Sequence, residues 1–163
     1  LKDAFLIEES ERYDIKGRQY RGALSKYYFK DCGLRNAILS FRQTEENHLM
    51  ENVLYNDLRG RGFQVDVGNI NIRVRDENGV QQRVTLEVDF VCNLGSKRYY
   101  IQSAWRMPDE DKMKQEQRSL CLVNDEFRKL IVVGERLKLR RNERGITIVG
   151  IYDFLLDKTT IDQ

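Results

Sequence analysis

The stretch at residues 85–106 constrains the fold most, because it predicts two adjacent antiparallel strands that carry acidic side chains. Side chains alternate between faces along a strand, so Glu87 and Asp89 share one face of the first strand, and Val88 and Phe90 share the other. Acidic residues are rare inside strands, and two carboxylates on one face need water, a partner or a metal. The pair is therefore a candidate site as well as a structural constraint.

The turn between these strands sets their register. Residues 93–97, Asn-Leu-Gly-Ser-Lys, interrupt the apolar pattern. A turn centred between the glycine and the serine places Asp89 opposite Gln102 and Glu87 opposite Ala104. A carboxylate that faces an amide across a hairpin is the start of an oxygen-rich cation site.

Composition and charge limit the class of protein. The chain has 163 residues, of which 40% are hydrophobic and 33% charged, as expected for one soluble globular domain with its own core. The net charge is +2, so any contact with nucleic acid must come from local basic clusters. No apolar run is long enough to span a bilayer, which predicts no membrane partner. The chain starts without an initiator Met, and we expect it to be a piece of a longer protein.

The cysteine and histidine content argues against several kinds of site. Cys32, Cys92 and Cys121 have no CxxC spacing, which favours free thiols in a reducing compartment and hence a cytoplasmic location. His48 is the single histidine, which argues against a histidine metal cluster or a Ser-His-Asp triad. The carboxylate pair therefore remains the main candidate site.

Two strands joined by a basic loop are expected at the start of the chain. Short apolar runs within residues 5–15 and a strand-like run at 25–30 flank a glycine-punctuated loop, which predicts a hairpin. The loop carries Lys16, Arg18 and Arg21. Two interpretations stay open, a solvated loop or a wing that contacts DNA phosphates.

Two helices are expected next. The first, at residues 33–41, turns three apolar side chains inward: Leu34, Ile38 and Leu39. The second has Thr44 as its predicted N-cap and an apolar face made of Leu49, Met50, Val53, Leu54 and Leu58. Glu51 lies at the edge of that face, on the same side of the helix as Leu54, Tyr55 and Leu58.

The middle of the chain alternates as strands. Residues 63–74 predict one bent strand or two, and Asn78-Gly79 predicts a hairpin that leads into the strand at 85–91. With the elements that follow, the order after Thr44 is α-β-β-β-α-β-β. This order predicts an α/β fold with a mixed β-sheet flanked by helices.

The last third supplies a helix, two strands and a basic loop. Pro108 begins a helix that ends near residue 122, and its sheet-facing candidates are Met113, Leu120 and Cys121. The apolar run at 130–133 is typical of a strand covered on both faces. The loop after it carries a basic run, which is either solvated or a phosphate-binding edge: Lys138, Arg140, Arg141 and Arg144. A final strand at 146–149 and a short helix at 152–156 close the chain.

Four segments carry a family resemblance: 26–36, 50–55, 87–91 and 100–102. A helix glutamate, a strand aspartate and a polar pair on the next strand resemble the PD-(D/E)XK nuclease superfamily. More closely, the whole chain resembles the C-terminal region of a family of bacterial and archaeal AAA-type ATPases. Those proteins carry a P-loop ATPase module, then a winged-helix element, then a nuclease-like domain.

The resemblance implies a fold and a site. It implies a remnant of a winged-helix hairpin and linker helix at 1–42, and a restriction-endonuclease-like domain at 43–163. It assigns Glu51, Asp89 and Gln102 to the catalytic positions that hold Mg²⁺, a cation that suits hard oxygen ligands and phosphate chemistry.

The sequence departs from that family at the lysine position. Gln102-Ser103-Ala104 places alanine where (D/E)xK has lysine, and alanine can neither orient a water nor stabilise an oxyanion. Lys112 or Lys114, on the following helix, could reach back. The other reading of Glu51 and Asp89 is that nearby arginine or backbone groups satisfy them, and Glu87 is either a salt-bridge partner or an auxiliary ligand.

Three functions follow as expectations. The first is a regulatory or nucleic-acid-binding module of an AAA-type ATPase with a degenerate nuclease site. The alternatives are an active Mg²⁺-dependent DNase and a protein-interaction module for ATPase assembly, with a homo-oligomer among its partners. The P-loop signature G-x-x-x-x-G-K-[ST] is absent, so ATP binding is expected only in a domain upstream of Leu1.

Overall fold

The computed structural model describes residues 1–42, 45–76, 79–107 and 109–163, and only the backbone of residues 21 and 23. The predicted N-cap at Thr44, the first residue of the Asn78-Gly79 turn and the helix start at Pro108 lie outside the described residues. So does the side chain of Arg21.

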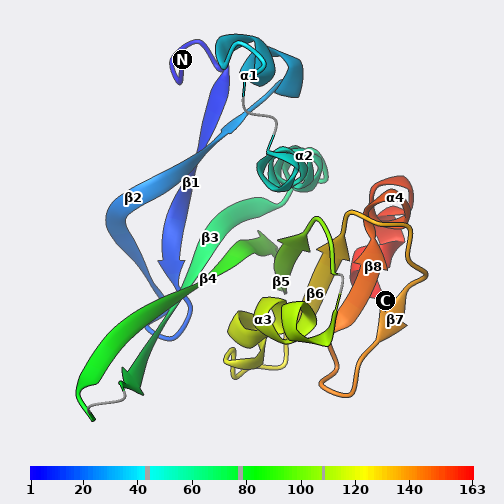
Figure 1. Ribbon diagram of the computed structural model, residues 1–163. Coiled ribbons are helices and arrows are strands. Elements are labelled where there is room, and N and C mark those ends of the chain that lie inside the picture. The colour runs from blue at the N-terminus through cyan, green and yellow to red at the C-terminus, as the bar shows by residue number, and fades with distance from the viewer. Residues whose placement is uncertain (43–44, 77–78, 108) are drawn as a thin grey trace.

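One mixed sheet dominates the described part of the chain, with the strand order β2-β1-β3-β4-β5-β6-β8-β7 (Figure 1). The strands are β1 (Ile7–Asp14), β2 (Gln19–Phe29), β3 (Gln64–Arg75), β4 (Gln81–Leu94), β5 (Lys97–Ala104), β6 (Arg128–Val133), β7 (Arg140–Arg141) and β8 (Thr147–Gly150). The helices are α1 (Cys32–Ile38), α2 (Glu46–Gly60), α3 (Glu110–Cys121) and α4 (Ile151–Leu156), followed by a 3-10 turn, η1 (Lys158–Asp162). The predicted α/β class with a large mixed sheet flanked by helices is confirmed.

Two apolar cores lie on the two faces of the sheet. On one face α2 and α4 pack against the strands through Leu54, Leu58 and Phe154, all fully buried. On the other face α3 packs through Leu120 (Figure 1). The run at 130–133 is buried throughout, as predicted for a strand between two helical layers.

The β4–β5 hairpin has the register that the sequence predicts. The paired residues run from Phe90 and Ile101 to Leu94 and Lys97, so the turn centres between Gly95 and the following serine. Gly95 adopts a φ of 59°, a left-handed conformation that glycine accepts without a steric penalty. The paired ladder stops at Phe90, one residue before Asp89.

A bulge in β4 changes which residues share a face. Residues 89 and 90 of β4 lie opposite the single residue 67 of β3, since Val91 pairs with Asp66 and Val88 pairs with Gly68. Val88 therefore packs in the α3 core and Phe90 in the α2 core. The predicted common face for Val88 and Phe90 is wrong, because a strict alternation of two cannot hold across an inserted residue.

The first hairpin belongs to the same sheet. β1 pairs with β2 in antiparallel fashion and with β3 in parallel fashion, so the hairpin extends the sheet beyond β3. The side-chain amide of Asn52, in α2, makes two hydrogen bonds to the backbone of Phe29. Its Nδ2 donates to the carbonyl of Phe29 at 2.7 Å, and its Oδ1 accepts from the N–H of Phe29 at 2.9 Å. These bonds fix the end of β2 against the middle of α2.

Some helix faces differ from expectation. Met50, Leu54 and Leu58 are buried as predicted. Three side chains predicted to face inward are exposed instead: Ile38, Leu39 and Cys121. Ile38 is the last residue of α1 and Leu39 is its C-cap, and none of the seven residues of this helix is buried. No helix among the described residues has the length and apolar character needed to cross a membrane.

Candidate functional site

A polar cleft of about 730 Å³ gathers all three residues that the sequence assigns to the site. Glu51 comes from α2, Asp89 from β4 and Gln102 from β5. Lys26 of β2 and Glu87 of β4 line it as well. We call it the carboxylate cleft, and its other lining residues come from the starts of α2 and α3 and from the end of β5.

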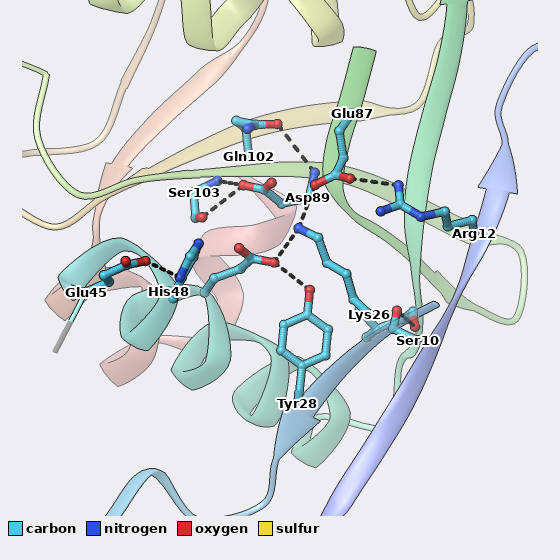
Figure 2. Close-up of polar contacts among 12 residues, drawn as sticks. Ser10, Arg12, Lys26, Tyr28, Glu45, His48, Glu87, Asp89, Gln102 and Ser103 are labelled. Atoms are coloured by element: carbon cyan, nitrogen blue, oxygen red, sulfur yellow. Dashed lines mark hydrogen bonds and ion pairs between the residues drawn. The ribbon is translucent and has the colours of Figure 1, made fainter. Parts of the chain in front are cut away.

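Lys26 lies between two glutamates of this cleft. Its Nζ is 2.8 Å from Oε1 of Glu51. The same nitrogen is 2.5 Å from Oε1 of Glu87, a contact that Figure 2 marks with a dashed line. Arg12 of β1 holds the other oxygen of Glu87 at 2.8 Å. Of the two interpretations of Glu87, the structure has it as a salt-bridge partner.

Burial and charge act against each other at these groups. Burial disfavours the ammonium of Lys26, but the carboxylates of Glu51 and Glu87 outweigh it and raise the pKa of Lys26. Burial also disfavours the carboxylate of Glu87, yet Lys26 and Arg12 hold the pKa of Glu87 below its usual value. Lys26 and Glu87 therefore hold each other in their charged forms.

Tyr28 adds a neutral donor to Glu51. Its hydroxyl donates to Oε1 of Glu51 at 2.6 Å, and its ring stacks on Tyr55 with the centroids 4.0 Å apart. Burial, followed by the charge of Glu51, raises the pKa of Tyr28, so the phenol stays protonated and remains a donor. Oε1 of Glu51 thus receives both Lys26 and Tyr28.

Asp89 occupies the point where β5 leaves β4. Its Oδ2 accepts from the backbone N–H of Ser103 at 2.7 Å and from the Ser103 hydroxyl at 2.9 Å (Figure 2). The carboxylate thereby replaces the ladder bond that is missing beyond Phe90. Burial, and then the charge of Glu51, raise the pKa of Asp89 to about 7, against the opposing effects of Ser103 and Lys26.

Both polar atoms of the Gln102 side chain have partners within the protein. Its Oε1 accepts from the backbone N–H of Asp89 at 3.4 Å, and its Nε2 donates to Glu116 at 3.4 Å. Glu116 also pairs with Lys112 at 2.6 Å. Of the two lysines expected to reach back, Lys112 lines the cleft, whereas Lys114 pairs with Asp111 at 3.5 Å on the exposed side of α3.

The resemblance implies Mg²⁺, and the donor set tests whether it fits. Glu51 and Asp89 each have one oxygen that accepts from two protein donors, and one of the two donors to Glu51 is the ammonium of Lys26. Among the described residues, no group of three or more His, Cys, Asp or Glu side chains is arranged to hold a metal ion. A divalent cation here would have to share the cleft with the ammonium of Lys26, whose positive charge opposes it.

The predicted nucleic-acid-binding residues do not form one surface. Lys16 and Arg18 line a second cleft beside the turn between β1 and β2. The other group, Lys138, Arg140 and Arg141, lies at or just before β7, at the opposite end of the strand order. Arg141 also donates to the carbonyl of Gln163 at 3.1 Å.

The sequence reasoning missed Lys26, Tyr28 and Ser103 as members of the site. A signal for the first two was present, because residues two apart in a strand share a face. Nothing local indicated that this face of β2 meets α2 and β4, since that depends on the parallel pairing of β1 with β3.

Comparison with known proteins gives one distant relative. An uncharacterized protein of Haemophilus influenzae is 26% identical over 156 residues, which is 96% of this chain and 35% of that protein. The chain thus spans about a third of the length of the curated relative it matches. No family model matches the chain, and no solved structure matches it.

Proposed function

We propose that this chain is a regulatory or nucleic-acid-binding module of a longer AAA-type ATPase, with a nuclease-like site that has lost catalysis. The observation that carries the loss is the salt bridge of Lys26 with Glu51 and Glu87 inside the carboxylate cleft. A protein ammonium there neutralises the acids that would otherwise attract a metal.

The remaining groups of the cleft agree with a binding or structural role. Asp89 is satisfied by Ser103, and Gln102 by Asp89 and Glu116. Ala104 lies in the lining but offers no side-chain donor. Because protein donors hold one oxygen of Glu51 and one of Asp89, these acids are less available to a metal ion or to a phosphodiester.

Nucleic-acid binding is supported by the cations outside this cleft. Lys16 and Arg18 are exposed, and within the described residues neither has an acidic partner. The β7 edge contributes Arg140, which is also exposed. Unpaired surface cations are the groups that contact phosphates and release counterions.

The ATPase context rests on the family resemblance. The Haemophilus protein has about two thirds of its length outside the match, which leaves room for a further domain in that protein. Any ATP binding is proposed for such an upstream domain, since the present sequence has no P-loop signature.

The test is DNA binding by fluorescence anisotropy at about 50 and 200 mM salt, together with a cleavage assay in Mg²⁺. We expect binding that weakens steeply with salt, and intact DNA. The triple variant Lys138→Gln, Arg140→Gln, Arg141→Gln should reduce the salt slope, whereas Arg73→Gln with Arg75→Gln should not. Self-association without DNA binding would contradict the proposal and favour an interaction module.

The second candidate is a Mg²⁺-dependent DNase. The observation in its favour is that Glu51, Asp89 and Gln102 converge on one cleft, as the nuclease resemblance requires. Cleavage that disappears in Glu51→Ala and in Asp89→Ala would establish this candidate and exclude a degenerate site.

A further inference from the structure

A second cleft, of about 900 Å³, lies at the other end of β5 from the carboxylate cleft. Three segments form it: residues 13–18 around the first turn, 93–98 at the β4–β5 turn, and 122–127 after α3. We call it the basic cleft. It shares no lining residue with the carboxylate cleft.

The charge of the basic cleft is strongly positive. Its lining has four cations, Lys16, Arg18, Lys97 and Arg98, against the single carboxylate of Asp125, a net charge of +3. Asp125 is already occupied, because it accepts from the Tyr100 hydroxyl at 2.6 Å and from the backbone N–H of Phe127 at 3.1 Å. Lys97 pairs with Asp162, so the lining cations without a carboxylate partner in the cleft are Lys16, Arg18 and Arg98, the last of which also bonds to the hydroxyl of Tyr100.

Arg98 is held in position for recognition. Its guanidinium lies 5.2 Å from the ring centre of Tyr13 and 5.6 Å from that of Phe127. Its Nε donates to Oδ1 of Asn93 at 2.7 Å. The terminal nitrogens of a guanidinium match two oxygens of one phosphate, and fixing the side chain beforehand lowers the entropy lost on binding.

The cleft also has an apolar wall. Ile15 and Leu122 contribute to the lining, and Phe127 is 42% exposed. An exposed aromatic ring beside cations is the combination that stacks a base next to its phosphate. The volume lies within the range of small-ligand sites, roughly 300–1,000 Å³.

We propose that the basic cleft binds the phosphomonoester of a nucleotide unit, either a free nucleoside monophosphate or the terminal phosphate of a nucleic-acid strand. A monoester dianion matches the three available cations better than the single charge of an internal diester. The site is separate from the carboxylate cleft, and its ligand can be tested apart from DNA binding by the β7 edge.

Isothermal titration calorimetry with matched ligands tests the ligand class. The probes are AMP and adenosine, and a 5′-phosphorylated oligonucleotide with its 5′-hydroxyl counterpart of the same sequence. We expect each phosphorylated ligand to bind about tenfold or more tightly than its unphosphorylated partner. AMP binding comparable to that of the strand identifies a free nucleotide, and a clear preference for the strand identifies a strand end. Equal binding within each pair would overturn the proposal.

Variants then test the location. Lys16→Gln with Arg18→Gln removes two exposed cations, and we expect about a tenfold or greater loss of affinity for the phosphorylated ligand. The matched control is Arg73→Gln with Arg75→Gln, two exposed cations of β3 that line neither cleft. If the two double variants bind the phosphorylated ligand with equal affinity, the proposal is overturned.

The two proposals fail separately. DNA binding that ignores the 5′-phosphate and survives Lys16→Gln with Arg18→Gln overturns the basic cleft and leaves nucleic-acid binding in place. AMP binding that is lost in this double variant, in a protein that does not bind DNA, supports the basic cleft and overturns nucleic-acid binding.

Discussion

Replacing Lys26 with methionine tests whether its ammonium takes the place of a metal. Methionine keeps the length and apolar stem of lysine but leaves Glu51 and Glu87 without their shared cation. The change therefore isolates the charge from the packing of the side chain.

The expected magnitude follows from burial. Removing one partner of a fully buried ion pair costs about 3–5 kcal/mol, and an exposed pair contributes at most about 1 kcal/mol. The side chains of Lys26, Glu51 and Glu87 are 26%, 13% and 34% exposed, between these limits. We expect Lys26→Met to lower the free energy of unfolding at pH 7 by about 2 kcal/mol.

The measurement is urea denaturation followed by the fluorescence of Trp105, the single tryptophan. Lys30→Met is the matched control, because Lys30 pairs with Glu8 while its side chain is 45% exposed, and its loss should cost less than about 1 kcal/mol. The pKa of Glu87 is lowered from 4.5, so the stability it contributes is present above pH 4.5 and is lost as the pH falls further. The effect of Lys26→Met should therefore shrink in acid.

Added Mg²⁺ distinguishes a stand-in cation from an ordinary salt bridge. Without Lys26, the glutamates attract a divalent ion, so millimolar Mg²⁺ should stabilise Lys26→Met and leave the wild type unchanged. If Lys26→Met unfolds within about 0.5 kcal/mol of the wild type at pH 7, the ammonium contributes no more than an exposed salt bridge would. If Mg²⁺ stabilises the wild type as well, the ammonium does not occupy the place of a metal.

Three further changes have defined outcomes. Because the pKa of Asp89 is raised from 3.8 to about 7, the folded protein holds a proton that the unfolded chain releases, and stability falls as the pH rises from about 4 to 7. Asp89→Asn should flatten that slope in urea titrations and stabilise the protein at pH 8 by about 1–4 kcal/mol; an unchanged slope would contradict this. Gly134→Ala should cost about 2 kcal/mol or more and shift the Trp105 emission, because the added Cβ would lie 2.5 Å from the indole ring; an unchanged spectrum and midpoint would contradict this. Tyr28→Phe should cost about 1 kcal/mol in thermal denaturation by removing the donor to Glu51, and a variant as stable as the wild type would mean that water replaces it.

The parts of the fold that the sequence predicts are the local ones. The turn at Gly95 fixes the β4–β5 register, because a two-residue connection leaves one way to pair the strands. The apolar run at 130–133 predicts a strand that is covered on both faces, because four consecutive apolar residues are themselves the signal.

The parts that the sequence does not predict depend on distant segments. The bulge that puts Val88 and Phe90 on opposite faces arises where β4 pairs with β3, and the sequence of neither strand indicates it. The site shows the same limit: Glu51, Asp89 and Gln102 are brought to one cleft, but the cation that meets Glu51 comes from β2, 25 residues earlier in the chain. A search for lysine confined to the strand of Gln102 and the helix after it could not find Lys26.

The role of the first hairpin leads to a last prediction, about residues 43–163 expressed without it. The hairpin supplies Lys26 to Glu51 and Arg12 to Glu87, and its β1 strand covers the edge of β3. Without it, two acids lose their cations and β3 gains an open edge, which promotes pairing with other chains.

We therefore expect the 43–163 fragment to unfold at lower urea concentration than the full chain and to elute as aggregates in size-exclusion chromatography. The fragment should regain solubility when the hairpin, residues 1–42, is supplied as a separate chain. A monomeric fragment with the stability of the full chain would contradict this expectation. It would mean that Glu51 and Glu87 are stable without Lys26 and Arg12. The cleft of the fragment could then bind a divalent cation at Glu51.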